Sequence, residues 1–156
     1  MKKLVECVPN FSEGRDQNKI GDIVKQMSDV PGITVLDVDP GPDTNRTVVT
    51  IVGSPEAVGE AAFQGIKRAS EVLDMSQHSG THPRMGATDV CPFIPVSDVT
   101  IEECVELSKQ VGNRVGDELK IPVFLYEKSA QKENRVKLPD IRKGEYEGLA
   151  EKLTDA

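Results

Sequence analysis

The chain has two histidines, His78 and His82, which lie four residues apart in a stretch that also contains Gly80 and Pro83. A spacing of four would place two imidazoles on one face of a helix, as in many metal sites. Glycine and proline oppose a helix here, and Pro83 favours an extended backbone at His82, so we expect no metal site. An imidazole can act as both acid and base near neutral pH, and this role competes with an ordinary surface or structural role.

The chain also contains aspartate, asparagine and arginine residues that could orient an imidazole or bind a substrate. Asp37 and Asp39 are two residues apart in a strand-like stretch, so their side chains share one face. Carboxylates there can orient an imidazole or bind an amine, although aspartate is also common in turns. A loop arginine can clamp a carboxylate with two hydrogen bonds, or it can be solvated. The candidate binding residues are Asn10, Asp39, Asn45 and Arg46, together with Arg84 in the histidine segment itself.

Three cysteines are present, namely Cys7, Cys91 and Cys104, and no two form a C-x-x-C pair. An odd number of cysteines at scattered positions argues against a disulfide framework or a cysteine-based zinc site and favours a reducing compartment. Cys91 is nine residues from His82, a separation that is compatible with a nucleophile. It lies in an apolar stretch, however, where cysteine usually packs as a small hydrophobic side chain, and we favour that reading.

Composition narrows the class of protein. A length of 156 residues predicts one domain over 1–156, and 37% hydrophobic with 29% charged residues is typical of a globular chain. The net charge of −7 argues against nucleic-acid or anionic-membrane partners. The apolar run at the N-terminus is interrupted by Glu6 and ended by Pro9, too early for a signal peptide. We therefore expect a cytoplasmic protein.

Strand and helix patterns alternate along the chain. Strand patterns cover 4–8, 33–37, 46–52, 89–96 and 121–126, with a turn cluster at 39–45 and a loop at 76–87. Helical patterns begin at Asp16, at Ser54-Pro55 and at Thr100, each with a capping side chain. The order βαββαβ followed by αβ predicts an α/β (α+β) ferredoxin-like layered domain with an added αβ unit, in which helices cover a mixed sheet. Because of Pro92 and Pro95, the fourth strand must lie at an edge or be irregular.

Four segments, residues 5–14, 36–47, 78–96 and, more weakly, 144–147, together closely resemble the N-terminal subdomain of the formiminotransferase (glutamate formimidoyltransferase) family. The resemblance implies transfer of a formimino group from N-formimino-L-glutamate to N5 of tetrahydrofolate, a step of histidine degradation. Some relatives use formylated or glycine-derived donors. The family's catalytic histidine falls on His82, which would act as general acid and base. Folate would be a co-substrate, and no metal is implied.

Residue type and position near these motifs suggest neighbours for His82. Asp39 would orient its ring or stabilise its protonated form, Arg46 or Arg84 would hold a substrate carboxylate, and Asn10 or Asn45 would contact an amide. In the family a second, smaller subdomain follows this unit, and folate lies between the two. We therefore expect small-molecule substrates and either a homo-oligomer or pairing with a C-terminal subdomain on another chain. The alternative is a non-catalytic folate-binding or assembly module that needs such a partner.

Overall fold

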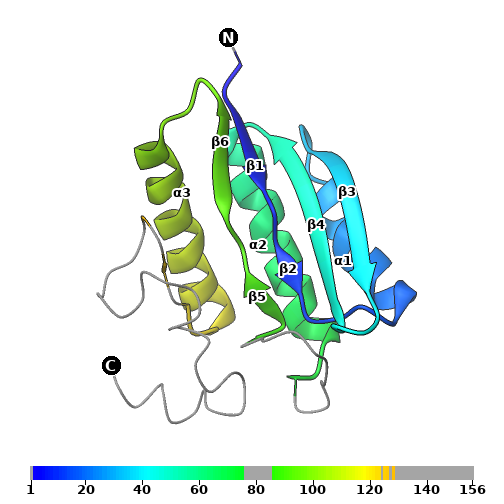
Figure 1. Ribbon diagram of the computed structural model, residues 1–156. Coiled ribbons are helices and arrows are strands. Elements are labelled where there is room, and N and C mark those ends of the chain that lie inside the picture. Colours follow the sequence, from blue (N-terminus) through cyan, green and yellow to red (C-terminus); the bar gives the residue numbers. More distant parts are fainter. Residues whose placement is uncertain (1, 76–85, 124, 127, 129–156) are drawn as a thin grey trace.

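Two helices lie against one face of an antiparallel sheet, and a third lies beside the last strand (Figure 1). The computed structural model describes residues 2–75, 86–123, 125, 126 and 128. The strands are β1 (Leu4–Cys7), β2 (Asn10–Phe11), β3 (Thr34–Gly41), β4 (Arg46–Gly53), β5 (Thr88–Val90) and β6 (Phe93–Ser97). The helices are α1 (Gln17–Ser28), α2 (Pro55–Val72), α3 (Ile101–Arg114) and a short π-helical turn, η2 (Val115–Leu119). The expected mixture of helices and strands is confirmed.

The sheet is built from four lines of backbone. β1 and β2 follow each other along one line; β4 pairs with both on one side, while β6 and β5 pair with them on the other. β3 pairs with the free side of β4. β4 thus lies between β1 and β3. Every strand pairing among the described residues is antiparallel. The expected mixed sheet is therefore wrong for this part of the chain.

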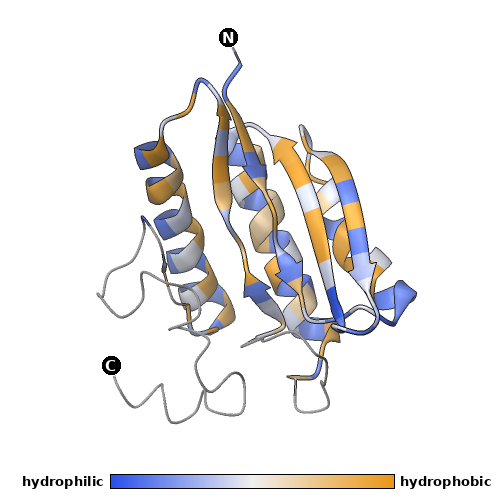
Figure 2. Ribbon diagram, in the orientation of Figure 1, coloured by the Kyte–Doolittle hydropathy of each residue, from blue (hydrophilic) through white to orange (hydrophobic). Residues whose placement is uncertain are grey.

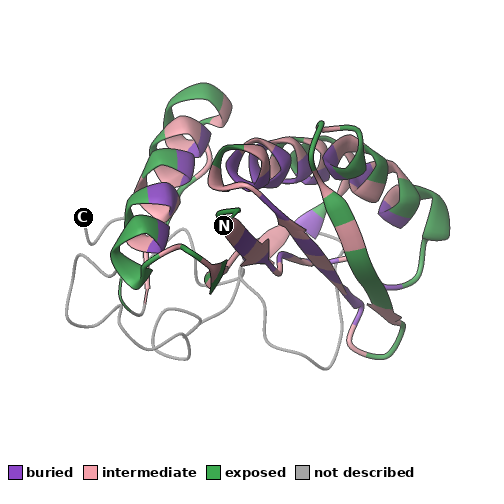
Figure 3. Cartoon of the chain, turned by 90° about the horizontal axis from the view of Figure 1, so that it is seen from above, coloured by how far each residue is buried: buried purple, intermediate pink, exposed green. Residues whose placement is uncertain are grey.

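The core lies between the sheet and helices α1 and α2. Along β4 the residues Thr47, Val49 and Ile51 are buried and alternate with less buried neighbours, as a strand with one covered face requires. Figure 3, seen from above, shows the buried residues of both helices on the side toward the strands. The predicted helix starts are confirmed, since Asp16 and Ser54 accept hydrogen bonds from first-turn backbone amides.

The third helix is confirmed but the strand expected after it is wrong. The Thr100 hydroxyl accepts a hydrogen bond from the Glu103 amide at 3.1 Å, and α3 continues into η2 as far as Leu119. Lys120 then adopts a left-handed conformation with φ of 58°. Pro122 follows and cannot donate to a strand ladder. Residues 121–123, 125 and 126 belong to no strand, so the added αβ unit contributes only its helix here.

The 89–96 segment forms an edge, as predicted, but in two pieces. β5 and β6 are separated by Cys91 and Pro92, and both pair with the β1–β2 line on one side.

Among the described helices, none combines the length and the apolar character needed to cross a membrane.

Candidate functional site

Polar residues from three distant segments meet at one end of the sheet. Figure 2 shows hydrophilic residues gathered where β2, β5 and the start of β4 lie side by side, whereas the rest of β4 is mainly hydrophobic. These positions belong to residues 10–14, 39–46 and 86–89. Asn10, Asn45 and Arg46, which are candidates of the sequence analysis, take part in the contacts that join them, together with Ser12 and Asp89.

Arg46, at the start of β4, reaches across β2 to β5. Its Nε and Nη2 donate to Asn10 Oδ1 at 2.9 and 2.7 Å, and its Nη1 donates to Asp89 Oδ2 at 2.9 Å. Asn10 Nδ2 in turn donates to the Val8 carbonyl at 2.8 Å. The Arg46 side chain is 9% exposed and that of Asp89 is 0% exposed. Two opposite charges are therefore held together almost without solvent, with Asn10 fixed beside them.

Asn45 closes the hairpin between β3 and β4. It has a φ of 51°, a left-handed conformation that asparagine tolerates better than most residues. Its Oδ1 accepts a hydrogen bond from the Gly14 amide at 2.9 Å. The predicted binding residue Asn45 is thus buried in a contact between the first and second segments.

Ser12 joins the first segment to the third. Its hydroxyl donates to the Gly86 carbonyl at 2.6 Å, and its amide donates to the Ala87 carbonyl at 2.8 Å. Gly86 and Ala87 are the first described residues after 76–85. The chain that leads out of that segment is therefore attached directly to residues just after β2.

Asp39 lies in β3 on the sheet face opposite α1 and α2. It pairs with Val48, and Val48 pairs with Asn10 on its other side, so Asp39 and Asn10 share a face two strands apart. With neighbouring strands about 5 Å apart, this places their backbones ~10 Å from each other. Asp39 is exposed, as is Asp37 on the same face. A ligand on this face would therefore find a carboxylate on one side and the Asn10–Arg46 pair on the other.

The other predicted site residues lie outside the described residues. These are His82 and Arg84, together with His78. Among the residues that are described, no group of three or more His, Cys, Asp or Glu side chains is arranged to hold a metal ion.

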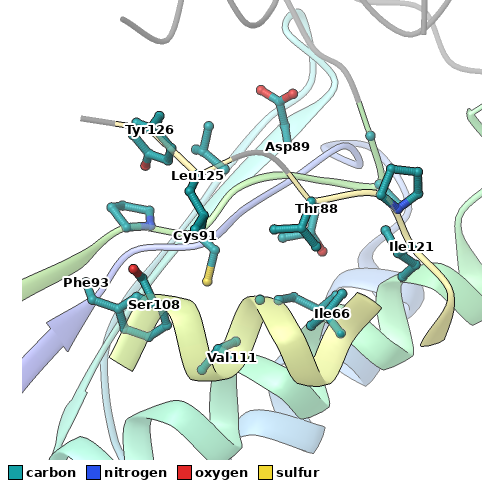
Figure 4. A pocket seen from close by; sticks show the side chains of 18 of the residues that line it. Ile66, Thr88, Asp89, Cys91, Phe93, Ser108, Val111, Ile121, Leu125 and Tyr126 are labelled. Carbon is teal, nitrogen blue, oxygen red and sulfur yellow. The ribbon is translucent and has the colours of Figure 1, made fainter. Parts of the chain in front are cut away.

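A separate cavity of about 780 Å³ lies between α3, the end of α2 and the β5–β6 edge. Its lining is mostly apolar, and it includes none of Asn10, Asp39, Asn45 or Arg46. In Figure 4 the Cys91 thiol points toward α3, whereas the Asp89 carboxylate points away from that helix. Asp89 contributes to the cavity wall, but its charged end faces the polar cluster. The polar cluster, rather than the cavity, is therefore our candidate site.

Cys91 packs against Cys7, with 3.6 Å between their sulfur atoms. Burial, reinforced by the hydrogen bond with Cys91, raises the pKa of the Cys7 thiol well above its usual range. Cys7 therefore stays protonated and packs as part of the core.

Asp89 is the site residue that sequence reasoning missed. It lies in the stretch Thr-Asp-Val-Cys-Pro, whose residues line the cavity beside α3. A charged residue in such a stretch must find a partner when it is buried, and that rule was the available signal. The partner, Arg46, is 43 residues away, so the pair is visible only in the fold.

Comparison with known proteins finds similar sequences over nearly the whole chain. The family model described as formiminotransferase domain, N-terminal subdomain, matches residues 4–156. The chain is 53% identical over 155 residues to a glutamate formimidoyltransferase of Streptococcus pyogenes, covering 99% of the chain and 52% of that protein. It is 56% identical over 155 residues to a formimidoyltransferase-cyclodeaminase of Dictyostelium discoideum, covering 99% and 29%.

A glutamate formimidoyltransferase of Thermoplasma acidophilum is 47% identical over 154 residues, covering 97% of the chain and 51% of that protein. The chain thus spans about half the length of these two glutamate formimidoyltransferases, and 29% of the Dictyostelium protein.

Proposed function

Because the chain belongs to the family of formiminotransferase N-terminal subdomains, we propose that it forms the N-terminal half of a unit that transfers a formimino group from N-formimino-L-glutamate to N5 of tetrahydrofolate. One observation carries this proposal. The segments that resemble the family's motifs meet at one end of the sheet through hydrogen bonds of Ser12, Asn45 and Arg46. Such a convergence is what a shared site needs.

The reaction requires one proton to leave one nitrogen and another proton to reach a second nitrogen. N5 of tetrahydrofolate attacks the amidine carbon of the formimino group and forms a C–N bond. The N5 proton is removed, the bond from that carbon to the glutamate nitrogen breaks, and the glutamate nitrogen gains a proton as it leaves. A single imidazole with a near-neutral pKa can accept the first proton and donate the second. We assign this role to His82.

The contacts of the described residues support our proposals for the remaining roles. Asp39, exposed on the open face of the sheet, is our candidate for orienting the His82 ring. Arg46 already directs three of its nitrogens to Asn10 and Asp89, so we assign the substrate carboxylate to Arg84 and give Arg46 the task of holding Asn10. Asn10 remains our candidate contact for a substrate amide through the second hydrogen of Nδ2, since the first is donated to the Val8 carbonyl.

We further propose that a C-terminal half covers the open face of the sheet, with folate as co-substrate between the halves and no metal ion. Ile94 and Val96 of β6 are 41% and 53% exposed, and such apolar side chains favour a covering partner. The βαββαβ order, in which β1 with β2 and β5 with β6 each count as one strand, supports a ferredoxin-like assignment. The odd set of unpaired thiols supports a cytoplasmic location.

The test is a transfer assay on this chain combined with the C-terminal half that its relatives possess. Formation of glutamate and 5-formiminotetrahydrofolate is followed by mass spectrometry. We expect turnover, a loss of about 10²- to 10⁴-fold in kcat for His82→Gln, and little change for the matched variant His78→Gln. Binding of 5-formyltetrahydrofolate without turnover would favour a non-catalytic folate-binding module instead.

A further inference from the structure

Asp89 is the extra residue of a β-bulge. Asn10 pairs with Val90 and Phe11 pairs with Thr88, so Asp89 is an extra residue between two successive register pairs of β2 and β5. Bulges redirect side chains and are frequent beside active sites. Here the bulge turns the Asp89 carboxylate away from α3, toward the polar cluster (Figure 4).

The bulged carboxylate meets a guanidinium that is held on two sides. Asp89 Oδ2 accepts from Nη1 of Arg46 at 2.9 Å, and Asn10 Oδ1 accepts from the Nε and Nη2 edge at 2.9 and 2.7 Å. A planar guanidinium bonded at two of its edges cannot rotate freely. The position of Asn10 Oδ1 therefore depends on where Asp89 holds Arg46.

Stability alone is a weak reason for such a pair. Removing two charges from water costs several kcal/mol per ion, and replacing a buried pair with apolar residues is often neutral or stabilising. The fold could therefore be equally stable with apolar side chains in place of this ion pair. The two charges lie on the face that we assign to substrate, which indicates that they are needed to fix the geometry of the site.

We propose that Asp89 is a positioning residue for the transfer reaction, acting through Arg46 to fix Asn10 on the substrate face. The inference rests on the proposed function, because Asn10 matters only if a substrate binds beside it. Asp89 itself touches Arg46 and is not assigned any contact with the reacting atoms.

The first experiment is a double-mutant cycle in kcat with the chain and its C-terminal half. Asp89→Asn keeps an acceptor of the same size, and Asn10→Ala removes the group that is positioned. We expect each single variant to lower kcat by about 10- to 100-fold. We expect the double variant to be no slower than the slower single variant, since the two act as one unit. If the loss of kcat in the double variant equalled the product of the two single losses, the inference would be overturned. A wild-type kcat in Asp89→Asn would also overturn it.

The second experiment separates positioning from folding. Asp89→Leu with Arg46→Met replaces the buried pair by apolar residues, and Asp22→Leu with Arg68→Met does the same to the half-exposed pair between α1 and α2, where Arg68 Nη2 lies 2.6 Å from Asp22 Oδ2. We expect both to unfold within a few degrees of wild type, yet only the first to lose transfer activity. Full activity in the first variant would show a structural role alone and overturn the inference.

Two further outcomes are distinguishable. If the Asp89/Arg46 replacement does not fold, the Asp89→Asn cycle decides the question by itself, because that substitution preserves size and an acceptor oxygen. If the unmodified assembly transfers no formimino group, the proposed function is wrong, and this inference, which rests on it, is wrong as well. Transfer by the unmodified assembly with unchanged kcat in Asp89→Asn rejects the inference alone.

Discussion

The backbone amide of Gly14 donates a hydrogen bond to the side-chain oxygen of Asn45 at 2.9 Å, across 31 residues of sequence. This bond brings the chain just before α1 against the β3–β4 hairpin. Because Gly14 has no side chain, its backbone approaches the carbonyl of Gly41 and the amide of Arg46 directly. The first two motif segments thus meet through this backbone-to-side-chain hydrogen bond and through a close approach of backbone to backbone at Gly14.

Gly14→Ala is expected to destabilise the fold. A Cβ at this position would lie 2.2 Å from the Gly41 carbonyl oxygen and 2.6 Å from the Arg46 amide nitrogen, and backbone atoms cannot rotate away. Overpacking of this kind costs about 1–3 kcal/mol, so the free energy of unfolding in urea should fall by at least that amount.

Gly21→Ala is the matched control. Gly21 lies in α1, and an added Cβ would meet nothing within 4 Å. Replacing a helical glycine by alanine should raise stability by about 0.5–1 kcal/mol. Equal effects of the two substitutions would contradict the close approach at Gly14.

Elements determined by neighbouring residues could be predicted from the sequence. The helix starts at Asp16, Ser54 and Thr100 depend on a side chain and an amide two or three residues away, and all three are confirmed. The predicted end of β3 at residue 37 is too early, because Pro40 and Gly41 are typical of turns. Both continue the pairing with β4, and a proline is tolerated there because β3 is an edge strand.

The candidate site was predictable only as a set of residue types. Asn10, Asn45 and Arg46 are binding candidates of the sequence analysis, and each takes part in the cluster, while their role in binding stays a prediction. Their partners could not be derived, because the Arg46–Asp89 pair depends on a bulge and on the strand order, both of which arise from packing. The assignment of His82 as acid and base stays a prediction.

Alkaline pH should destabilise the fold through Cys7. Burial raises the pKa of this thiol, so the folded protein keeps it protonated when the unfolded chain begins to ionise near its ordinary value of 9.0. The unfolded state then binds fewer protons, and the free energy of unfolding decreases as pH rises. The stabilising contribution is complete below pH 9.0 and is lost toward the higher folded pKa.

Urea unfolding between pH 8 and 10 measures this effect. Cys7→Ala should reduce the downward slope by up to about one proton per molecule. Val5→Ala truncates another fully buried side chain of β1 without removing an ionisable group, so it should lower stability but keep the wild-type slope. An unchanged slope in Cys7→Ala would show that the thiol ionises equally in both states.

Lys120→Gly should stabilise the protein. Lys120 follows η2 with a φ of 58°, and a left-handed conformation costs an L-residue about 1–2 kcal/mol that glycine does not incur. After allowing for the greater chain entropy of glycine, we expect a gain of ~0.5–1 kcal/mol in thermal or urea unfolding. Lys109→Gly, in the interior of α3, should instead lose about as much. A loss for both variants would contradict the left-handed turn.

Two threonines of the sheet should respond in opposite ways to replacement by valine. The Thr88 hydroxyl is buried and has no hydrogen-bond partner among the described residues, whereas the Thr47 hydroxyl, also buried, donates to the Glu13 carbonyl. Valine keeps the branched shape of threonine and exchanges the hydroxyl for a methyl group. At Thr88 this removes an unsatisfied group, which costs about 1–3 kcal/mol when it is buried, so the free energy of unfolding should rise by ~1 kcal/mol.

At Thr47 the same exchange leaves the Glu13 carbonyl without its donor. We therefore expect Thr47→Val to lower the free energy of unfolding by about 1–3 kcal/mol. Urea unfolding of both variants at one pH checks the pair, and their difference is more informative than either value, because the change in side-chain shape is common to both. If Thr88→Val were as destabilising as Thr47→Val, the Thr88 hydroxyl would have to be hydrogen-bonded in solution, for instance to an ordered water molecule between β5 and α2.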